Sequence, residues 1–179
     1  SVAFVSPRAL ALLKQELVDF NGIGRIITSD YLGFNSPAAF TELLNLTRLG
    51  VDVRIHNATA FHPKGYVFQN NRAVTAMVGS SNLTENALVT NHEWNLKVTA
   101  AIGSDLASQF SELMADQVAN SVPLTEAWIA DYAANYTPPA LRRPGLRRTL
   151  PDRAAEPVDS PDTRIVPNKM QRDALQAIE

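Results

Sequence analysis

The chain has 179 residues, a length that fits one domain of ordinary size followed by an irregular tail. It contains no cysteine, which excludes disulfide bonds, thiolate zinc sites and cysteine nucleophiles. The net charge is −2, and residues 1–135 hold 8 Lys and Arg against 12 Asp and Glu. A broad basic surface is therefore absent from the main domain, and a polyanion would have to be held by a local cluster of groups.

Neither the N-terminus nor any internal stretch has the long apolar run of a signal peptide or a membrane-spanning helix. The lack of cysteine also fits a reducing compartment. We therefore expect a cytoplasmic protein that has no membrane partner.

The first third of the chain alternates between strand and helix patterns. Runs of apolar and β-branched residues predict strands at 2–6, 25–28 and 51–55. Helices are predicted to begin at Pro7 and Pro37, because each proline follows a serine and precedes leucines spaced on one face. The order βαβαβ implies an α/β fold with a mixed, largely parallel sheet flanked by helices.

The middle of the chain changes to an antiparallel pattern. Two strands are predicted at 62–69 and 73–80, joined by the polar turn Asn70-Asn71. A short helical turn at 83–88 and an alternating strand at 93–100 follow. The apolar face of that last strand is expected in the core: Trp94, Leu96 and Val98.

Two helices and a change of composition complete the chain. Amphipathic spacing predicts helices at 105–118 and 125–134. Prolines and arginines then interleave over 137–163, a composition typical of an extended linker. We therefore divide the chain into a domain at 1–136, the linker at 137–163, and the start of a further domain at 164–179.

Five polar side chains are predicted to gather at one edge of the sheet. His62 and Lys64 lie two residues apart on a predicted strand, so both side chains leave the same face. Ser80 and Asn82 lie at the end of the partner strand, and Glu93 begins the next strand. Phosphoryl transfer needs such a set: a nucleophile or acid of near-neutral pKa, a fixed positive charge, and neutral donors around the phosphate oxygens.

The residues around these side chains resemble a known signature. His62-Pro63-Lys64 followed by Gly79-Ser80-Ser81-Asn82 is similar to the HxK…GSxN pattern of the phospholipase D (HKD) superfamily. Residues 83–84 and 91–94 resemble the nuclease branch of that superfamily. The similarity covers roughly residues 2–134, and it implies a phospholipase D-like half with one repeat per chain.

Two departures from the family pattern guide the interpretation. Gln69 stands where the family usually has an aspartate, and the hairpin before Gly79 is longer than usual, which favours divergent nucleases over lipases. Only one HxK is present, since neither His56 nor His92 is followed by a lysine two residues later. Family members with a single motif build their site across a homodimer, so the resemblance implies that two copies of His62 meet over one phosphate.

The resemblance also implies a role for each residue. His62 of one chain would attack phosphorus and form a phosphohistidine, while His62 of the other chain would act as acid and then as base. Lys64 and Asn82 would hold the phosphate oxygens, Ser80 would support them, and Glu93 would orient a His62 ring. Two lysines would supply the positive charge that a metal otherwise provides, so neither metal nor cofactor is expected.

Simpler interpretations of the same residues stay open. His62 and Lys64 could be an ordinary surface pair on an edge strand, and Glu93 could do no more than pair with Lys97 or cap a strand. Asn95 and Lys97 share the predicted face of Glu93 and are candidates to bind substrate, although a solvated strand face is the better explanation of both.

The tail favours DNA as the substrate. Residues 165–175 resemble the entry to a superfamily 2 helicase domain, in which Gln171 would read adenine, whereas an ordinary helix start after Pro167 is the alternative. We therefore expect the nuclease module of a helicase-linked restriction or repair enzyme, a metal-independent endonuclease-like phosphodiesterase. The alternatives are a phospholipase or phosphatidyltransferase of the same superfamily, and an inactive dimerisation or DNA-docking module.

Overall fold

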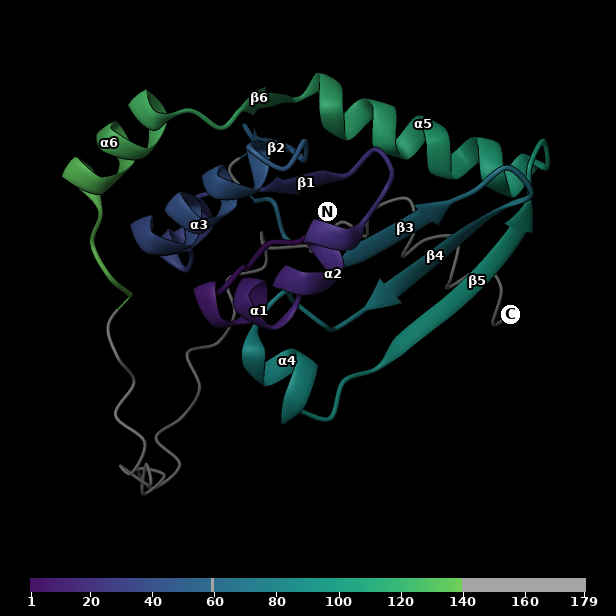
Figure 1. Ribbon diagram of the computed structural model, residues 1–179, viewed down its shortest axis with the longest axis horizontal. Helices are drawn as coiled ribbons and strands as arrows, with labels where there is room; N and C mark the ends of the chain where they lie inside the picture. Colours follow the sequence, from purple (N-terminus) through teal and green to yellow (C-terminus); the bar gives the residue numbers. More distant parts are fainter. Residues whose placement is uncertain (59, 140–179) are drawn as a thin grey trace, which may run out of the picture. The chain divides into compact units, whose positions relative to one another are not determined.

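The computed structural model describes residues 1–58 and 60–139, in which two three-stranded sheets are accompanied by helices (Figure 1). The helices are α1 (Pro7–Leu12), α2 (Lys14–Asp19), α3 (Pro37–Thr47), α4 (Glu85–Val89), α5 (Asp105–Ala119) and α6 (Glu126–Asn135). The strands are β1 (Arg25–Thr28), β2 (Asp52–His56), β3 (Gly65–Gln69), β4 (Ala73–Gly79), β5 (Asn95–Ala101) and β6 (Ser121–Pro123). The predicted helicase-like start at 164–179 and all but the first three residues of the predicted linker lie outside the described residues.

The first sheet has the strand order β1-β2-β6. β1 and β2 are parallel, with Ile26 beside Val53, whereas β6 runs antiparallel to β2. β6 was not predicted, because its three residues are too short for an alternating pattern to register.

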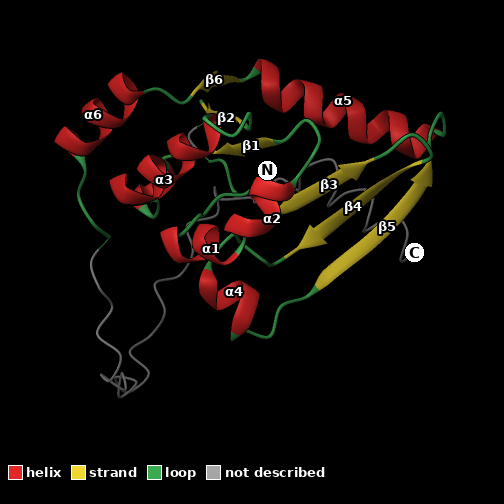
Figure 2. Cartoon of the chain, in the orientation of Figure 1, coloured by secondary structure: helices red, strands yellow, loops and turns green. Residues whose placement is uncertain are grey.

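The second sheet, β3-β4-β5, is antiparallel throughout (Figure 2). The turn at Asn70 is confirmed: its side-chain oxygen accepts hydrogen bonds from the N–H groups of Arg72 (2.8 Å) and Ala73 (2.9 Å). The expected α/β class with a mixed sheet is confirmed. Parallel pairing among these strands is nevertheless confined to β1 and β2, because β4 returns beside β3 by a tight turn and β5 returns beside β4 after the segment that holds α4, both in antiparallel sense.

The N-terminal segment joins the two sheets. Val2 N–H donates to the carbonyl of Ile27 on β1 (3.0 Å), and Ala3 N–H donates to the carbonyl of Pro63 just before β3 (2.9 Å). The predicted strand at 2–6 is therefore wrong in form, since only isolated bridges occur there. The segment bonds first to one element and then to another, so no continuous ladder with a single partner develops.

Helix α3 supplies much of the first core. Ser36 caps this helix by accepting a hydrogen bond from Ala39 N–H (3.2 Å), as the Ser-Pro pattern predicts. Phe40 and Leu43 are fully buried, and the ring of Phe40 meets Trp128 of α6 edge to face at 4.8 Å. No helix in residues 1–58 and 60–139 is long and apolar enough to cross a membrane.

A buried carboxamide, Asn35, anchors the loop that follows β1. Its Oδ1 accepts a hydrogen bond from Val5 N–H (2.7 Å), and its Nδ2 donates to the carbonyls of Ala3 (2.9 Å) and Ser29 (2.7 Å). The hydroxyl of Tyr132 on α6 donates to the backbone carbonyl of Asn35 (2.7 Å). The loop after β1 is thus tied to both the N-terminal segment and α6.

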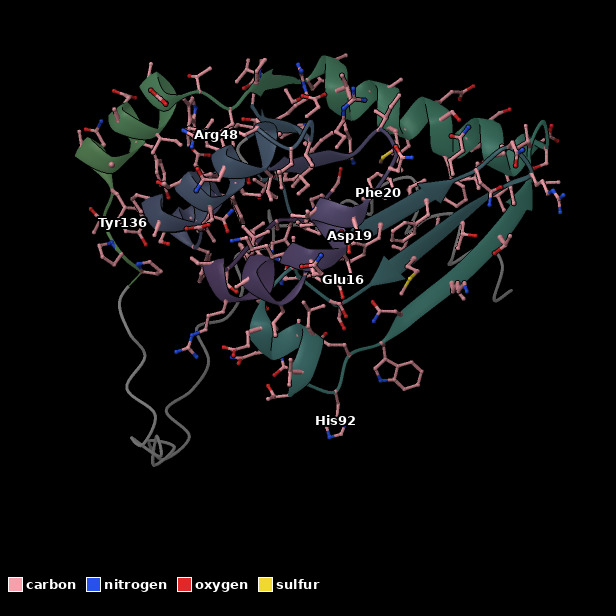
Figure 3. The ribbon with its side chains drawn as sticks, viewed as in Figure 1. Glu16, Asp19, Phe20, Arg48, His92 and Tyr136 are labelled. Carbon is pink, nitrogen blue, oxygen red and sulfur yellow. The ribbon has the colours of Figure 1, made fainter. Side chains whose placement is uncertain are left out.

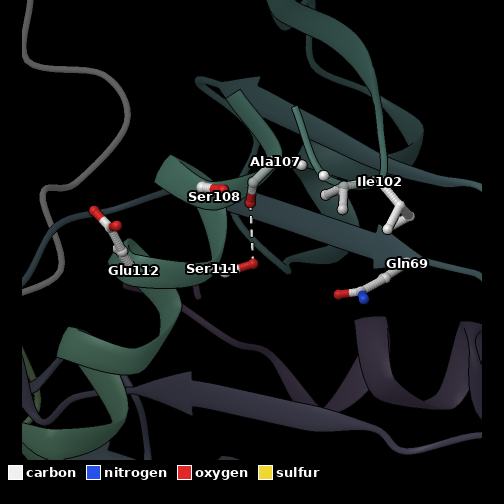
Figure 4. Close-up of a pocket in the computed structure, with 8 residues that line it drawn as sticks. Gln69, Ile102, Ala107, Ser108, Ser111 and Glu112 are labelled. Atoms are coloured by element: carbon white, nitrogen blue, oxygen red, sulfur yellow. Dashed lines mark hydrogen bonds between the residues drawn. The ribbon is translucent and has the colours of Figure 1, made fainter. Parts of the chain in front are cut away.

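Helix α5 covers only one end of the second sheet. Its Ala107 packs with Val74 of β4 and Ala100 of β5 in a small buried cluster, against which Phe110 rests. A groove of about 280 Å³ lies between this helix and the sheet, and Gln69 lines it at the end of β3 far from Lys64 (Figure 4).

The opposite end of the same sheet face is open. The expectation that Trp94, Leu96 and Val98 form a core row is wrong for the first two, because Trp94 is 89% exposed and Leu96 is 67% exposed. Val78 lies directly across from Leu96 and is exposed as well. The alternating pattern was read correctly as an apolar face, but α5 follows the far end of β5 and packs over Ala100 instead.

Candidate active site

His62 and Lys64 meet at the start of β3. The expectation that both lie on a strand is wrong, because β3 begins at Gly65: His62 belongs to the loop before it, and Lys64 forms only an isolated bridge with Val2. Their side chains are nevertheless in contact, with 2.9 Å between Lys64 Nζ and His62 Nδ1. An ammonium group only donates, so the imidazole nitrogen is the acceptor in this contact.

Backbone pairing brings the Gly79-Ser80 turn beside this pair. Gly79 N–H donates to the carbonyl of Lys64 (3.2 Å), so the start of β3 and the end of β4 lie side by side. A side chain at Gly79 would overlap the carbonyl oxygen of Trp94 and the side chain of Asn95, which explains why glycine is needed there. The two halves of the signature therefore meet at one sheet end, as the sequence predicts.

Glu93 is held by neutral donors. Ser80 Oγ donates to one oxygen of its carboxylate and Asn91 Nδ2 to the other (3.0 Å). The hydrogen bonds from Ser80 and Asn91 lower the pKa of Glu93, and the charge of Lys64 lowers it further. The carboxylate is therefore ionised near Lys64. Its hydrogen bonds within the described chain go to Ser80 and Asn91, and neither His62 nor Lys97 is among its partners.

Two opposing effects act on the pKa of Lys64. Partial burial lowers the pKa of Lys64, and the Glu93 carboxylate offsets part of that change. Its ammonium also lies 5.9 Å from the ring centroid of Phe4. The site thus holds a cation in a less hydrated setting than an ordinary surface lysine has, which strengthens its attraction for an anion.

Asn82 and Ser81 position the rest of the turn. Asn82 Oδ1 accepts a hydrogen bond from Phe4 N–H (3.3 Å), which leaves the amide N–H groups as its remaining donors. Ser81 is buried, and its carbonyl accepts from the hydroxyl of Tyr66 (3.1 Å). Burial, followed by the Glu93 charge, raises the pKa of Tyr66 to about 12, so this hydroxyl keeps its proton.

The two residues predicted to extend the substrate site differ in placement. Asn95 Nδ2 donates to Ser81 Oγ (2.8 Å), so this amide supports the turn. Lys97 is exposed and lies opposite Met77. It shares a sheet face with Asn95, which lies opposite Gly79, but it is two residues farther along β5 from the turn. Neither contacts His62 in the described structure, and both remain predictions as substrate-binding residues.

The other two histidines lie outside this cluster, as expected. His56 Nδ1 accepts from Ala58 N–H (3.0 Å) and its ring stacks on Phe61 with centroids 4.4 Å apart. His92 projects away from the molecule between α4 and β5 (Figure 3). The described chain therefore brings a single imidazole to the cluster.

Aromatic neighbours of His62 were missed by sequence reasoning. The exposed imidazole meets the ring of Phe4 edge-on at 5.1 Å and that of Tyr31 at 6.1 Å. Both rings lie far from His62 in sequence, in the N-terminal segment and the loop after β1. An aromatic residue in those loops carries no periodic signal, so only the fold reveals the contact.

The cluster brings together the groups that phosphodiester chemistry requires, and a family match agrees. A family model described as "Cardiolipin synthase, PLD-like domain" matches residues 5–117, a range that includes all five predicted site residues. The chain belongs to the phospholipase D-like superfamily, whose domains hydrolyse or transfer phosphodiester bonds. A search of curated proteins finds no significant match.

Proposed function

We propose that the chain supplies half of a metal-independent site that cleaves DNA, and that two copies complete it. The observation that carries this proposal is the contact between His62 and Lys64 beside an ionised Glu93, with one imidazole where two are needed. Cleavage through a covalent intermediate requires a nucleophile and a separate acid for the leaving oxygen. A second copy of the chain provides that acid without any new residue type.

Cleavage in such a dimer takes two steps. In the first, His62 of one copy forms a bond to phosphorus, the bond to the leaving oxygen breaks, and His62 of the second copy gives that oxygen its proton. In the second, the same second imidazole takes a proton from water, whose oxygen attacks phosphorus and releases the first His62. Lys64 from each copy and the amide N–H groups of Asn82 stabilise the phosphate oxygens.

The Glu93 carboxylate can accept a further hydrogen bond from the second copy in this dimer. A carboxylate accepts several hydrogen bonds, and within the chain Ser80 and Asn91 provide one each. We propose that in the dimer the His62 ring exchanges its contact with Lys64 for Glu93 of the other copy, which accepts the Nδ1–H and leaves Nε2 to face phosphorus. That bond would fix the tautomer and stabilise the cationic imidazole.

An exposed apolar patch beside Glu93 offers a surface for the second copy. We call Val78, Trp94 and Leu96 the β5 patch; all three are exposed and Trp94 directly follows Glu93. Clustered apolar side chains of this kind on a small domain mark an interaction surface. We propose that the second copy, where it reaches Glu93, also covers Trp94 and the patch that continues from it onto the opposite sheet face.

DNA is preferred to lipid on sequence grounds. Residues 83–84 and 91–94 resemble the nuclease branch, and residues 165–175 resemble the entry to a helicase domain. The matching family description names cardiolipin synthase, so phosphatidyl transfer is the second candidate. An inactive docking module is the third, and the intact His62–Lys64 contact argues against it.

One experiment separates the three candidates. The purified chain and its His62→Ala variant are incubated in excess EDTA with plasmid, with single-stranded oligonucleotide and with phosphatidylglycerol vesicles. We expect the unaltered chain to cleave DNA and leave the lipid intact, and the variant to cleave neither substrate. Cleavage that needs added magnesium, or that is equal in both proteins, would overturn the mechanism, and lipid turnover alone would favour the second candidate.

The charge of Lys64 predicts an alkaline limit of activity. Burial lowers the pKa of Lys64, so its ammonium loses its proton at a lower pH than a free lysine does. Activity should fall as the pH rises through this lowered pKa. Arginine stays charged, so Lys64→Arg should retain a larger share of its own maximal kcat/KM at high pH. The matched control is Lys97→Arg, and alkaline limbs that coincide in all three proteins would contradict the assignment.

A further inference from the structure

Two exposed apolar side chains and a partly buried tyrosine form an edge next to His62. We call Tyr31, Leu32 and Phe34 the aromatic rim; Leu32 is 63% exposed and Phe34 is 49% exposed. Leu32 has φ 54° and ψ 15°, the left-handed conformation that a leucine rarely adopts. A strained and exposed apolar residue next to a chemical site indicates that the shape of this loop has a use.

The rim is held firmly in place. Gly33 N–H donates to the Asp30 carbonyl (2.9 Å) and Tyr31 N–H donates to Ser29 Oγ (3.3 Å) within the loop. Asn35, the next residue after the rim, is buried with its carboxamide hydrogen-bonded to the N-terminal segment. The exposure of Leu32 and Phe34 is therefore built into the fold.

The rings of the rim are continuous with the site. Phe34 packs on Phe4 with centroids 4.6 Å apart, and the same Phe4 ring meets His62 at 5.1 Å. The ring of Tyr31 also lies beside that of His62, with centroids 6.1 Å apart. A phosphate held by His62 and Lys64 would bring the group attached to it over these rings.

We propose that the aromatic rim stacks a nucleobase adjacent to the scissile phosphate, and that the site accordingly takes unpaired DNA. The inference rests on the proposed function and names its substrate class. Aromatic rings bind any base through its flat face, and in a duplex the neighbouring base pairs cover both faces of each base. Only an unpaired nucleotide can offer a face to Phe34.

The charges around the rim favour a base over a membrane. Segments that settle on membranes combine apolar side chains with lysines and arginines that attract acidic headgroups. The rim is preceded by Asp30, and residues 26–47 contain no lysine or arginine. The nearby cation, Lys64, already contacts His62.

Binding measurements test the rim without relying on cleavage. In the His62→Ala background and in EDTA, fluorescence anisotropy compares a labelled thymidine oligonucleotide with one of equal length made of abasic residues. Phe34→Leu keeps an apolar side chain but removes the ring, and we expect it to weaken binding of the thymidine oligonucleotide about tenfold and leave the abasic one unchanged. Phe34→Trp should retain affinity, and so should Phe68→Leu, because Phe68 is 58% exposed on β3 at the end away from His62.

Each other outcome has a definite meaning. Equal loss on both oligonucleotides, or no loss on either, overturns stacking. Dissociation of Phe34→Leu dimers in light scattering would make the rim a subunit contact, and loss of phosphatidylglycerol vesicle binding with unchanged oligonucleotide affinity would make it a membrane contact. If His62→Ala binds no DNA, the proposed substrate fails together with the rim. If stacking holds while the unaltered chain cleaves nothing in EDTA, only the proposed chemistry fails.

Discussion

His62→Ala should abolish DNA cleavage, and dimers that contain one altered and one unaltered chain should be inactive as well. The reason is that the two copies of His62 have different tasks in one reaction, one as nucleophile and the other as acid. Removal of either stops the sequence of steps, and groups that act as a unit lose activity together, on the order of 10³-fold or more. Only dimers of two unaltered chains would then cleave.

Mixing the two proteins measures this dependence. When subunits exchange freely, the share of fully unaltered dimers is the square of the unaltered fraction, so an equimolar mixture should retain about a quarter of the activity of the same total of unaltered protein. His92→Ala is the matched control, because that histidine projects away from the molecule and its mixtures should stay fully active. A linear decline in the His62→Ala series would show that each chain works alone.

The sequence correctly predicted the elements whose ends are marked by local capping or turn residues. Ser36 and Pro37 mark the start of α3 because a serine hydroxyl caps a helix and proline suits its first turn, and both effects act within a few residues. The hairpin turn at Asn70 is local for the same reason. The strand limits were less accurate: His62 and Glu93 each precede their strands, since pairing with a neighbour, and not local pattern, decides where a ladder begins.

The contacts in the site also differ in whether local sequence predicts them. The contact of His62 with Lys64 and that of Ser80 with Glu93 follow from a signature of spaced residues, and the fold brings each pair together. Phe4 reaches His62 only because the N-terminal segment runs between β1 and the start of β3. Such a contact depends on the whole topology, so the sequence contains no short-range sign of it.

The error at Trp94 has a different origin. The alternation of Trp94 and Leu96 correctly marks an apolar face, but α5, the helix that packs on this face, lies over Ala100 and leaves Trp94 and Leu96 exposed. An apolar face is stabilised when it is buried, but the sequence pattern does not say whether the same chain or another chain buries it. Under the proposed homodimer, the second copy does.

Trp94→Asp should therefore convert dimers to monomers and abolish cleavage. Val78 and Leu96 face each other across β4 and β5, and Trp94 extends this β5 patch toward Glu93. A tryptophan in the centre of an interface commonly contributes 2 kcal/mol or more, so the dissociation constant should rise by roughly 30-fold or more. Because Trp94 is 89% exposed in the single chain, the free energy of unfolding of the monomer should change little.

Analytical ultracentrifugation and EDTA-resistant cleavage, measured over a range of protein concentrations, report the two effects together. Phe68→Asp is the matched control, because Phe68 is an exposed aromatic residue on the opposite face of the same sheet. High protein concentration should restore both the dimer and the activity of Trp94→Asp, since the chemical groups of the site are intact in each chain. A Trp94→Asp protein that remains dimeric and active would place the interface elsewhere on the chain and leave the shared His62 site untouched by this result. A monomer with full activity would contradict the shared site itself, because a single chain brings only one imidazole to the phosphate.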